Sequence, residues 1–201
     1  MKKRLIISFI FLIIWTIFIK TNNTSWFDEP IYNFIISFKD YALTSVMRII
    51  SFFASAKWLI GICLVCLISL LWKKYYSLYL MCTLFFSTGC NLILKAILKR
   101  DRPSVLWLTN ETGFSYPSGH AMASMAFYGA IMVLVKYSNV SSKKAVYIST
   151  GILIFLIGVS RVYLGVHYPS DIIGGWIMGY IILCVLDYIV GGIYEGTIKW
   201  R

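Results

Sequence analysis

Six long runs of apolar residues are the feature that most limits what this chain can fold into. They are Leu5 to Ile19, Trp58 to Trp72, Tyr76 to about Leu98, about Ser118 to Val135, Ala145 to about Leu164 and Ile172 to about Ile193. A helix needs about 20 mainly apolar residues to cross a bilayer. Apolar and aromatic residues make up 59% of the chain, against about 45–50% in soluble domains. The sequence therefore predicts an all-α integral membrane bundle of about six transmembrane helices, forming a single domain over residues 1–201.

The stretch from Trp26 to Phe53 differs from these runs, because charged residues interrupt it too often for a span. Ile31, Phe34, Ile35 and Phe38 recur at helical spacing, which predicts an interfacial amphipathic segment of one or two helices between the first and second spans. An equally favoured alternative is that these side chains pack on the bundle and do not lie in the membrane interface. The acidic residues of the stretch, which we expect to be solvated, are Asp28, Glu29 and Asp40.

The basic residues behind the net charge of +11 cluster at the ends of the apolar runs, which argues against nucleic acid as a partner. Lys and Arg in short loops mark the cytoplasmic side of a membrane protein. With six spans, one side collects Lys2-Lys3-Arg4, Lys73-Lys74, Lys143-Lys144 and the tail residues Lys199 and Arg201. We therefore expect a multi-pass protein of the plasma membrane of a bacterial cell envelope, with both termini cytoplasmic.

Four cations break this rule at the outer end of the third span. They are Lys95, Lys99, Arg100 and Arg102. The spacing of Lys95, Lys99 and Arg102 places them on one helix face, and Pro103 is expected to end the helix at Arg102. Lys and Arg together suit a phosphate. A ring of surface cations that meets lipid head groups is the alternative.

Two further clusters are predicted at the same outer side. Ser118 can cap the fourth span, Gly119 allows close backbone approach, and His120 can transfer a proton. Arg161 lies near the end of the fifth span, and His167 precedes Asp171 by four residues, which places imidazole and carboxylate within reach on a helical segment. An interfacial His and a helix-capping Asp without mutual contact remain the alternative.

Together these residues resemble the three-part motif of the type 2 phosphatidic acid phosphatase superfamily, in its membrane branch of lipid phosphatases. The first part is Lys95, six residues, then Arg102-Pro103. The second is Pro117-Ser118-Gly119-His120. The third is Ser160-Arg161, five residues, His167, three residues, Asp171. Every position is matched in order, and the motifs lie within residues 95–171.

The resemblance implies a metal-independent lipid phosphatase without a cofactor. His167 would form a phosphohistidine, Asp171 would orient it and His120 would protonate the leaving oxygen. The implied phosphate-binding residues are Lys95, Arg102, Ser118, Gly119 and Arg161. Bacterial members act on undecaprenyl diphosphate, phosphatidylglycerophosphate, phosphatidic acid or diacylglycerol pyrophosphate, and the motif does not separate these.

Two alternatives share the same residues. A lipid phosphotransferase would pass the phosphoryl group to another alcohol, and an anionic-lipid binder or transporter would use the basic rim without chemistry. Binding alone requires neither His120 nor the His167 and Asp171 pair. The expected partners are therefore a lipid phosphate and the bilayer, while the sequence assigns no oligomeric state and no role to Lys99, Arg100 or residues 26–53.

Overall fold

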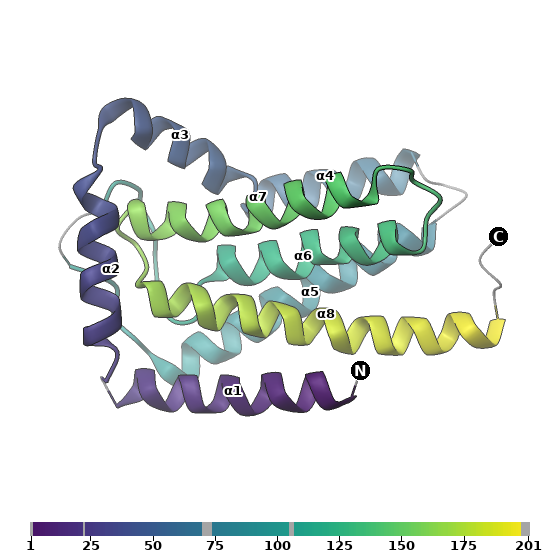
Figure 1. The fold of residues 1–201 in the computed structure, drawn as a ribbon, viewed down its shortest axis with the longest axis horizontal. Helices are drawn as coiled ribbons and strands as arrows, with labels where there is room; N and C mark the ends of the chain where they lie inside the picture. Colours follow the sequence, from purple (N-terminus) through teal and green to yellow (C-terminus); the bar gives the residue numbers. More distant parts are fainter. Residues whose placement is uncertain (1, 22, 70–73, 105–106, 198–201) are drawn as a thin grey trace.

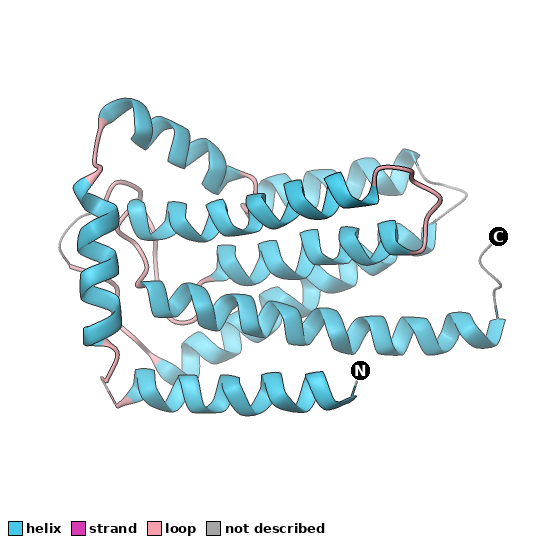
Figure 2. Cartoon of the chain, in the orientation of Figure 1, coloured by secondary structure: helices cyan, strands magenta, loops and turns pink. Residues whose placement is uncertain are grey.

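The computed structural model describes residues 2–21, 23–69, 74–104 and 107–197, and within these ranges it is helical without strands (Figure 2). The helices are α1 (Lys2–Lys20), α2 (Ser25–Ser37), α3 (Tyr41–Phe52), α4 (Ala56–Ser69), α5 (Lys74–Leu98), α6 (Gly119–Lys136), α7 (Lys143–Tyr163) and α8 (Pro169–Thr197). The expected all-α class is confirmed.

Four of these helices are long and apolar enough to span a membrane, namely α5 to α8. The number rises to six if two bent pairs each count as one span, because α1 and α2 meet at 85° and α3 and α4 meet at 45°. The expectation of about six spans agrees with the upper figure. The residues Lys73, Lys199 and Arg201, which entered the prediction of orientation, lie outside the described residues.

The centre of the bundle is the interface between α6 and α8, the most extensive helix pair. Glycines of α8 allow this approach, because a Cβ at Gly175 would lie 2.7 Å from the carbonyl oxygen of Ser118, and one at Gly179 would lie 2.6 Å from that of Met122. Small residues bring helix backbones together in membrane proteins in the same way. The close contact fixes the start of α6 against the start of α8.

The stretch from Trp26 to Phe53 forms two helices: α2 crosses one end of the bundle, and α3 lies beside α7 near that end (Figure 1). Asp40 caps α3 by accepting hydrogen bonds from the backbone N–H groups of Ala42 (2.8 Å) and Leu43 (3.1 Å). Both α2 and α3 pack on α7, and α2 also contacts α8. These helices are thus part of the bundle wall at that end.

The third apolar run ends at Leu98 as predicted, but the helix does not continue to Arg102. α5 ends at Leu98, before Arg102, because Lys99 adopts a left-handed backbone conformation (φ 46°) while its N–H still bonds to the carbonyl of Lys95 (3.1 Å). A left-handed residue is a common helix stop. The exposed Lys99 therefore does not share a helix face with Arg102.

Candidate active site

The three predicted clusters meet at one end of the bundle. α5 and α7 end there, and α6 and α8 begin there, while the start of α1 and the end of α8 lie at the opposite end (Figure 1). The loop of residues 99–118 and the turn of residues 164–168 join these helix ends. The sequence placed these clusters on one rim, and the structure brings their side chains together.

Asp171, in the first turn of α8, is the most enclosed charged group of the site, with an exposed fraction of 0%. Its Oδ1 accepts a hydrogen bond from Nη1 of Arg100 (2.6 Å). Its Oδ2 accepts from the hydroxyl of Ser115 (2.5 Å) and from the backbone N–H of Tyr168 (2.8 Å). Both carboxylate oxygens are therefore fixed, as a buried charge requires.

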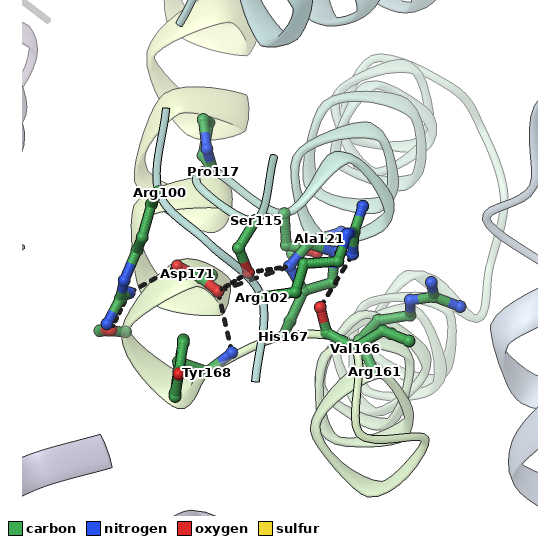
Figure 3. A network of polar contacts seen from close by, with 12 residues as sticks. Arg100, Arg102, Ser115, Pro117, Ala121, Arg161, Val166, His167, Tyr168 and Asp171 are labelled. Carbon is green, nitrogen blue, oxygen red and sulfur yellow. Dashed lines mark hydrogen bonds and ion pairs between the residues drawn. The ribbon is translucent and has the colours of Figure 1, made fainter. Parts of the chain in front are cut away.

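His167 lies between Asp171 and the guanidinium of Arg102 (Figure 3). Its Nδ1 is 3.2 Å from the Ser115 hydroxyl oxygen and 3.5 Å from Oδ2 of Asp171. Its Nε2 is 3.3 Å from Nη1 of Arg102. A guanidinium can only donate, so Nε2 carries the lone pair and Nδ1 carries the proton.

Ser115 completes this arrangement. Since an ionised carboxylate only accepts, the Ser115 hydroxyl donates to Asp171 and leaves its own lone pair for the Nδ1–H of His167. The serine thus joins the carboxylate to the imidazole. Both of its neighbours favour the same tautomer, the one whose Nε2 can act as a nucleophile.

Burial governs the charge state of His167. Desolvation lowers the pKa of its imidazole to about 4, a decrease that Asp171 opposes only in part. A buried imidazole is harder to protonate because its charged form loses hydration. His167 is therefore neutral near pH 7, with a free lone pair on Nε2.

Arg102 is held by backbone carbonyls from two segments. It donates from Nε to Gly113 (2.9 Å), from Nη1 to Val166 (2.8 Å) and from Nη2 to Thr112 (3.1 Å). Burial lowers the pKa of its guanidinium, but an arginine remains charged at neutral pH. A fixed cation thus lies directly beside the His167 Nε2.

Arg161, near the end of α7, is buried with an exposed fraction of 2%. It donates from Nη1 to the Ser51 hydroxyl of α3 (2.6 Å), and its Nη2 pairs with the carboxylate of Glu111. Within the described chain its Nε is buried and has no hydrogen-bond partner. An unpaired buried donor beside a histidine is suited to an anionic ligand.

Lys95, His120, Ser118 and Gly119 complete the predicted set. Lys95 lies close enough to Arg102, Glu111 and Asp171 for their charges to act on it, and His120 is similarly near Arg161 and His167. Ser118 caps α6, accepting from the N–H of Ala121 (3.5 Å), so that the first-turn N–H groups of Gly119 and His120 face the site end.

One prediction about a charged residue is wrong. Asp28 is not solvated: its exposed fraction is 2%, and Oδ2 lies 2.7 Å from Nη2 of Arg100. Arg100 in turn bridges Asp28 and Asp171. In the sequence, Asp28 stands among the apolar residues of α2. Arg100, whose charge compensates the burial of Asp28, is 72 residues away along the chain.

Sequence reasoning also missed Ser115 and gave Glu111 no role in the site. Ser115 lies two residues before Pro117 and outside the quoted motif. The Glu111 carboxylate pairs with Arg161 and lies 3.9 Å from Nη2 of Arg102. The only signal for Glu111 was that it is an acid in a loop between two basic motifs.

Comparisons with known proteins identify a family and a matching fold. The model of the PAP2 superfamily matches residues 75–193. Phosphatidylglycerophosphatase B of Bacillus subtilis is 32% identical over 198 residues, or 96% of each chain. Undecaprenyl-diphosphatase of Sulfolobus acidocaldarius is 40% identical over 77 residues, covering 38% of this chain and 34% of that protein. The crystal structure of a transmembrane PAP2 type phosphatidylglycerolphosphate phosphatase from Bacillus subtilis superposes with a TM-score of 0.87 at 28% identity, covering 98% of both chains.

Proposed function

Because the chain belongs to the PAP2 superfamily of type 2 phosphatidic acid phosphatases, and is thereby a membrane lipid phosphatase, we propose that it removes phosphate from a lipid through a phosphohistidine on His167. The resemblance drawn from the three motifs is confirmed at the level of the family. The observation that carries the proposed mechanism is the orientation of His167, whose Nδ1 faces Ser115 and Asp171 while Nε2 faces Arg102.

The reaction proceeds in two displacements. Nε2 of His167 attacks phosphorus, the bond from phosphorus to the lipid oxygen breaks, and His120 gives its proton to that oxygen. Water then attacks the phosphohistidine, its proton returns to His120, and the bond from phosphorus to Nε2 breaks. The products are the dephosphorylated lipid and inorganic phosphate, and both histidines return to their starting states.

Fixed cations supply the charge that this reaction needs. Negative charge on the phosphoryl oxygens is met by Lys95, Arg102 and Arg161, and by the N–H groups at the capped start of α6, to which Ser118 and Gly119 belong. Asp171 stabilises the cationic ring of His167. We therefore expect turnover without a divalent metal ion, which a chelator tests.

An apolar groove beside His120 supports a lipid substrate. A cavity of about 210 Å³ is lined by Asn91, Gly119 and His120 together with Ile60 and Leu84. A second cavity, of about 410 Å³, shares Ile60 and Leu84 and extends toward Cys63 and Phe85 between α4 and α5. A hydrocarbon chain in this groove would leave the attached phosphate at the histidines.

We rank the candidate substrates by how much of this chain aligns with the relatives named for them. A relative named phosphatidylglycerophosphatase B aligns along nearly the whole chain, whereas the undecaprenyl-diphosphatase aligns along 38% of it. We rank the phosphate monoester of phosphatidylglycerophosphate first and undecaprenyl diphosphate second. Hydrolysis is distinguished from phosphotransfer by assaying products with and without an added alcohol.

The membrane orientation is part of the same proposal. The start of α1 lies at the same end of the bundle as the end of α8, opposite the site (Figure 1), and Lys143 and Lys144 begin α7 at that end. Lys and Arg accumulate on the cytoplasmic side. We infer that both termini lie on the cytoplasmic side of a bacterial plasma membrane and that the site lies at its outer face.

The decisive experiment measures phosphate release by the purified protein in lipid nanodiscs. The panel contains phosphatidylglycerophosphate, undecaprenyl diphosphate and phosphatidic acid, with His167→Ala as the blank and Lys144→Gln, at the opposite end, as the matched control. We expect no detectable turnover in His167→Ala, normal turnover in the control and acid-labile phosphate on the wild type after rapid quenching with labelled lipid. Activity should persist in EDTA. A near-normal rate for His167→Ala, or strict dependence on Mg²⁺, would contradict the mechanism.

A further inference from the structure

Arg100 stands apart from the other arginines of the site, because all four donors of its terminal nitrogens are occupied by the protein. Nη1 donates to the hydroxyl of Ser170 (2.7 Å) and to Oδ1 of Asp171 (2.6 Å). Nη2 donates to the hydroxyl of Thr24 (3.1 Å) and to Oδ2 of Asp28 (2.7 Å). Each terminal nitrogen of a guanidinium carries two hydrogens, so all four are used.

The position of Arg100 also separates it from the phosphate side. Figure 3 shows Arg100 on one side of Asp171, with Arg102 and Arg161 on the other. One face of its guanidinium covers the ring of Tyr168, with 4.4 Å to the centroid. No terminal donor of Arg100 is left for a substrate oxygen.

We propose that Arg100 and Asp28 are positioning residues, which hold the Asp171 carboxylate in the orientation that His167 needs. This inference rests on the proposed function, since it assumes that His167 is the nucleophile. Arg100 fixes Oδ1, and the other oxygen, Oδ2, is thereby directed at Ser115 and His167. The helix α2, through Asp28, is then a component of the active site.

Asp28 is fixed as firmly as the carboxylate it supports. Its Oδ1 accepts from the backbone N–H of Ser170 (2.8 Å), and its Oδ2 accepts from the Ser170 hydroxyl (2.7 Å) as well as from Arg100. Ser170 immediately precedes Asp171 in α8. Asp28 therefore holds both Arg100 and the backbone that carries Asp171.

The charges of the group explain why a second carboxylate is present. Arg100 alone would cancel the charge of Asp171 and weaken its support of a cationic His167 ring. Asp28 offsets Arg100, so that the set of two carboxylates and one guanidinium keeps one net negative charge beside the imidazole. Low-dielectric surroundings make such an imbalance effective. Asp28 thus preserves the electrostatic action of Asp171 while Arg100 fixes its geometry.

The test measures kcat, KM and the inhibition constant of inorganic phosphate for Arg100→Ala in nanodiscs. We expect kcat to fall about 100-fold, as misplacement of a catalytic group typically causes, while KM and phosphate inhibition stay within threefold of wild type. Methylguanidinium should restore activity, because Arg100 lines a cavity of about 300 Å³ through which the small cation can enter. Lys99→Ala, which removes the exposed neighbouring cation, is the matched control and should keep wild-type kcat.

A second variant guards against misfolding. Arg100→Ala leaves two buried carboxylates without their cation, which is strongly destabilising. Asp28→Asn with Arg100→Met removes the cation and one carboxylate together and should fold, with the same loss of kcat at unchanged phosphate inhibition. Asp28→Asn alone should lower kcat about tenfold, as removal of an outer support of a site often does.

Three results would overturn the inference. Wild-type kcat in the double variant would mean that Arg100 does not position Asp171. Weaker phosphate inhibition, as expected for Arg102→Gln, would identify Arg100 as a phosphate ligand. A loss that methylguanidinium does not relieve in folded Arg100→Ala would indicate a purely structural brace. If instead His167→Ala retains activity, the proposed function fails as well, which keeps the two failures distinct.

Discussion

The arginines on the two sides of His167 differ in how many carboxylates they pair with. On the Asp171 side, Arg100 is shared by two buried carboxylates, with exposed fractions of 2% and 0%. On the other side, the one carboxylate that pairs with Arg102 and Arg161 within the described residues is that of Glu111, which is 27% exposed. One side is a closed set of pairs and the other has an excess of cations.

This difference separates two tasks within one cluster of basic residues. A guanidinium whose donors are filled by protein groups can only hold neighbouring groups in place. A guanidinium with an unpaired Nε, such as that of Arg161, or one beside the proposed nucleophilic nitrogen, such as that of Arg102, can receive an anion. Pairing therefore predicts whether a variant changes substrate affinity or turnover alone.

The largest expected effect beyond loss of the nucleophile comes from the open side. Arg161→Gln removes a cationic donor whose hydrogen bond to the phosphoryl group would strengthen as negative charge develops on the phosphoryl oxygens. We therefore expect kcat/KM to fall about 1,000-fold. Phosphate inhibition should weaken as well, which steady-state assays with lipid and inorganic phosphate measure. Arg161→Lys, which keeps charge without the planar fork, should recover only part of the loss. Unchanged phosphate inhibition in Arg161→Gln would mean that Arg161, like Arg100, holds neighbouring groups in place and does not bind phosphate.

The pH dependence tests the closed side. Because burial lowers the pKa of His167 to about 4, the neutral form that the proposed mechanism requires is kept above that pH and is lost as the pH falls through about 4. At pH 5 an imidazole of ordinary pKa, about 6.5, would be only about 3% neutral. Activity at pH 5 should therefore be about 30-fold higher than for such an imidazole. A profile of kcat/KM from pH 4 to 8 measures this, and an acid limb near pH 6.5 would contradict the burial argument.

Removal of Ser115 should give a smaller loss. In Ser115→Ala, Asp171 keeps Arg100 and the Tyr168 N–H but loses the hydroxyl that joins it to the imidazole, so kcat should fall about tenfold. Phosphate inhibition should stay unchanged, since no phosphate-side residue is altered. Ser115→Thr, which retains the hydroxyl, is the matched control. Equal losses in the alanine and threonine variants would argue against a role for the hydroxyl.

The smallest expected effect concerns the carboxylate on the open side. Glu111→Gln removes a negative charge that competes with phosphate for Arg161 and Arg102, so inorganic phosphate should inhibit about threefold more strongly, a change worth about 0.6 kcal/mol. Glu29→Gln, at an exposed acid of α2, serves as the control for loss of one negative charge. Weaker inhibition in Glu111→Gln would mean that Glu111 supports the cations rather than competing for them.

Hydropathy was enough to predict an all-helical membrane bundle, and motif spacing was enough to predict the end of the bundle at which the motif residues meet. The order of Lys95, His120 and His167 along the chain, combined with alternating helix direction, already brought them to one end. The pairing of charges was not predictable, because Asp28 and Arg100 are separated by 72 residues and Ser170 and Asp28 by 142. Acidic residues are usually exposed, and periodicity describes one helix at a time, so Asp28 was expected to be solvated.

The hydrogen bonds from Ser170 to Asp28 also bear on how the protein is made. The two partners lie near opposite ends of the chain, on α2 and α8. Because α2 is synthesised before α8, Asp28 can bond to Ser170, and through Arg100 support Asp171, only once the start of α8 has been made. Under the proposed mechanism, a chain that ends before α8 therefore lacks the carboxylate that orients His167, and we expect it to be inactive.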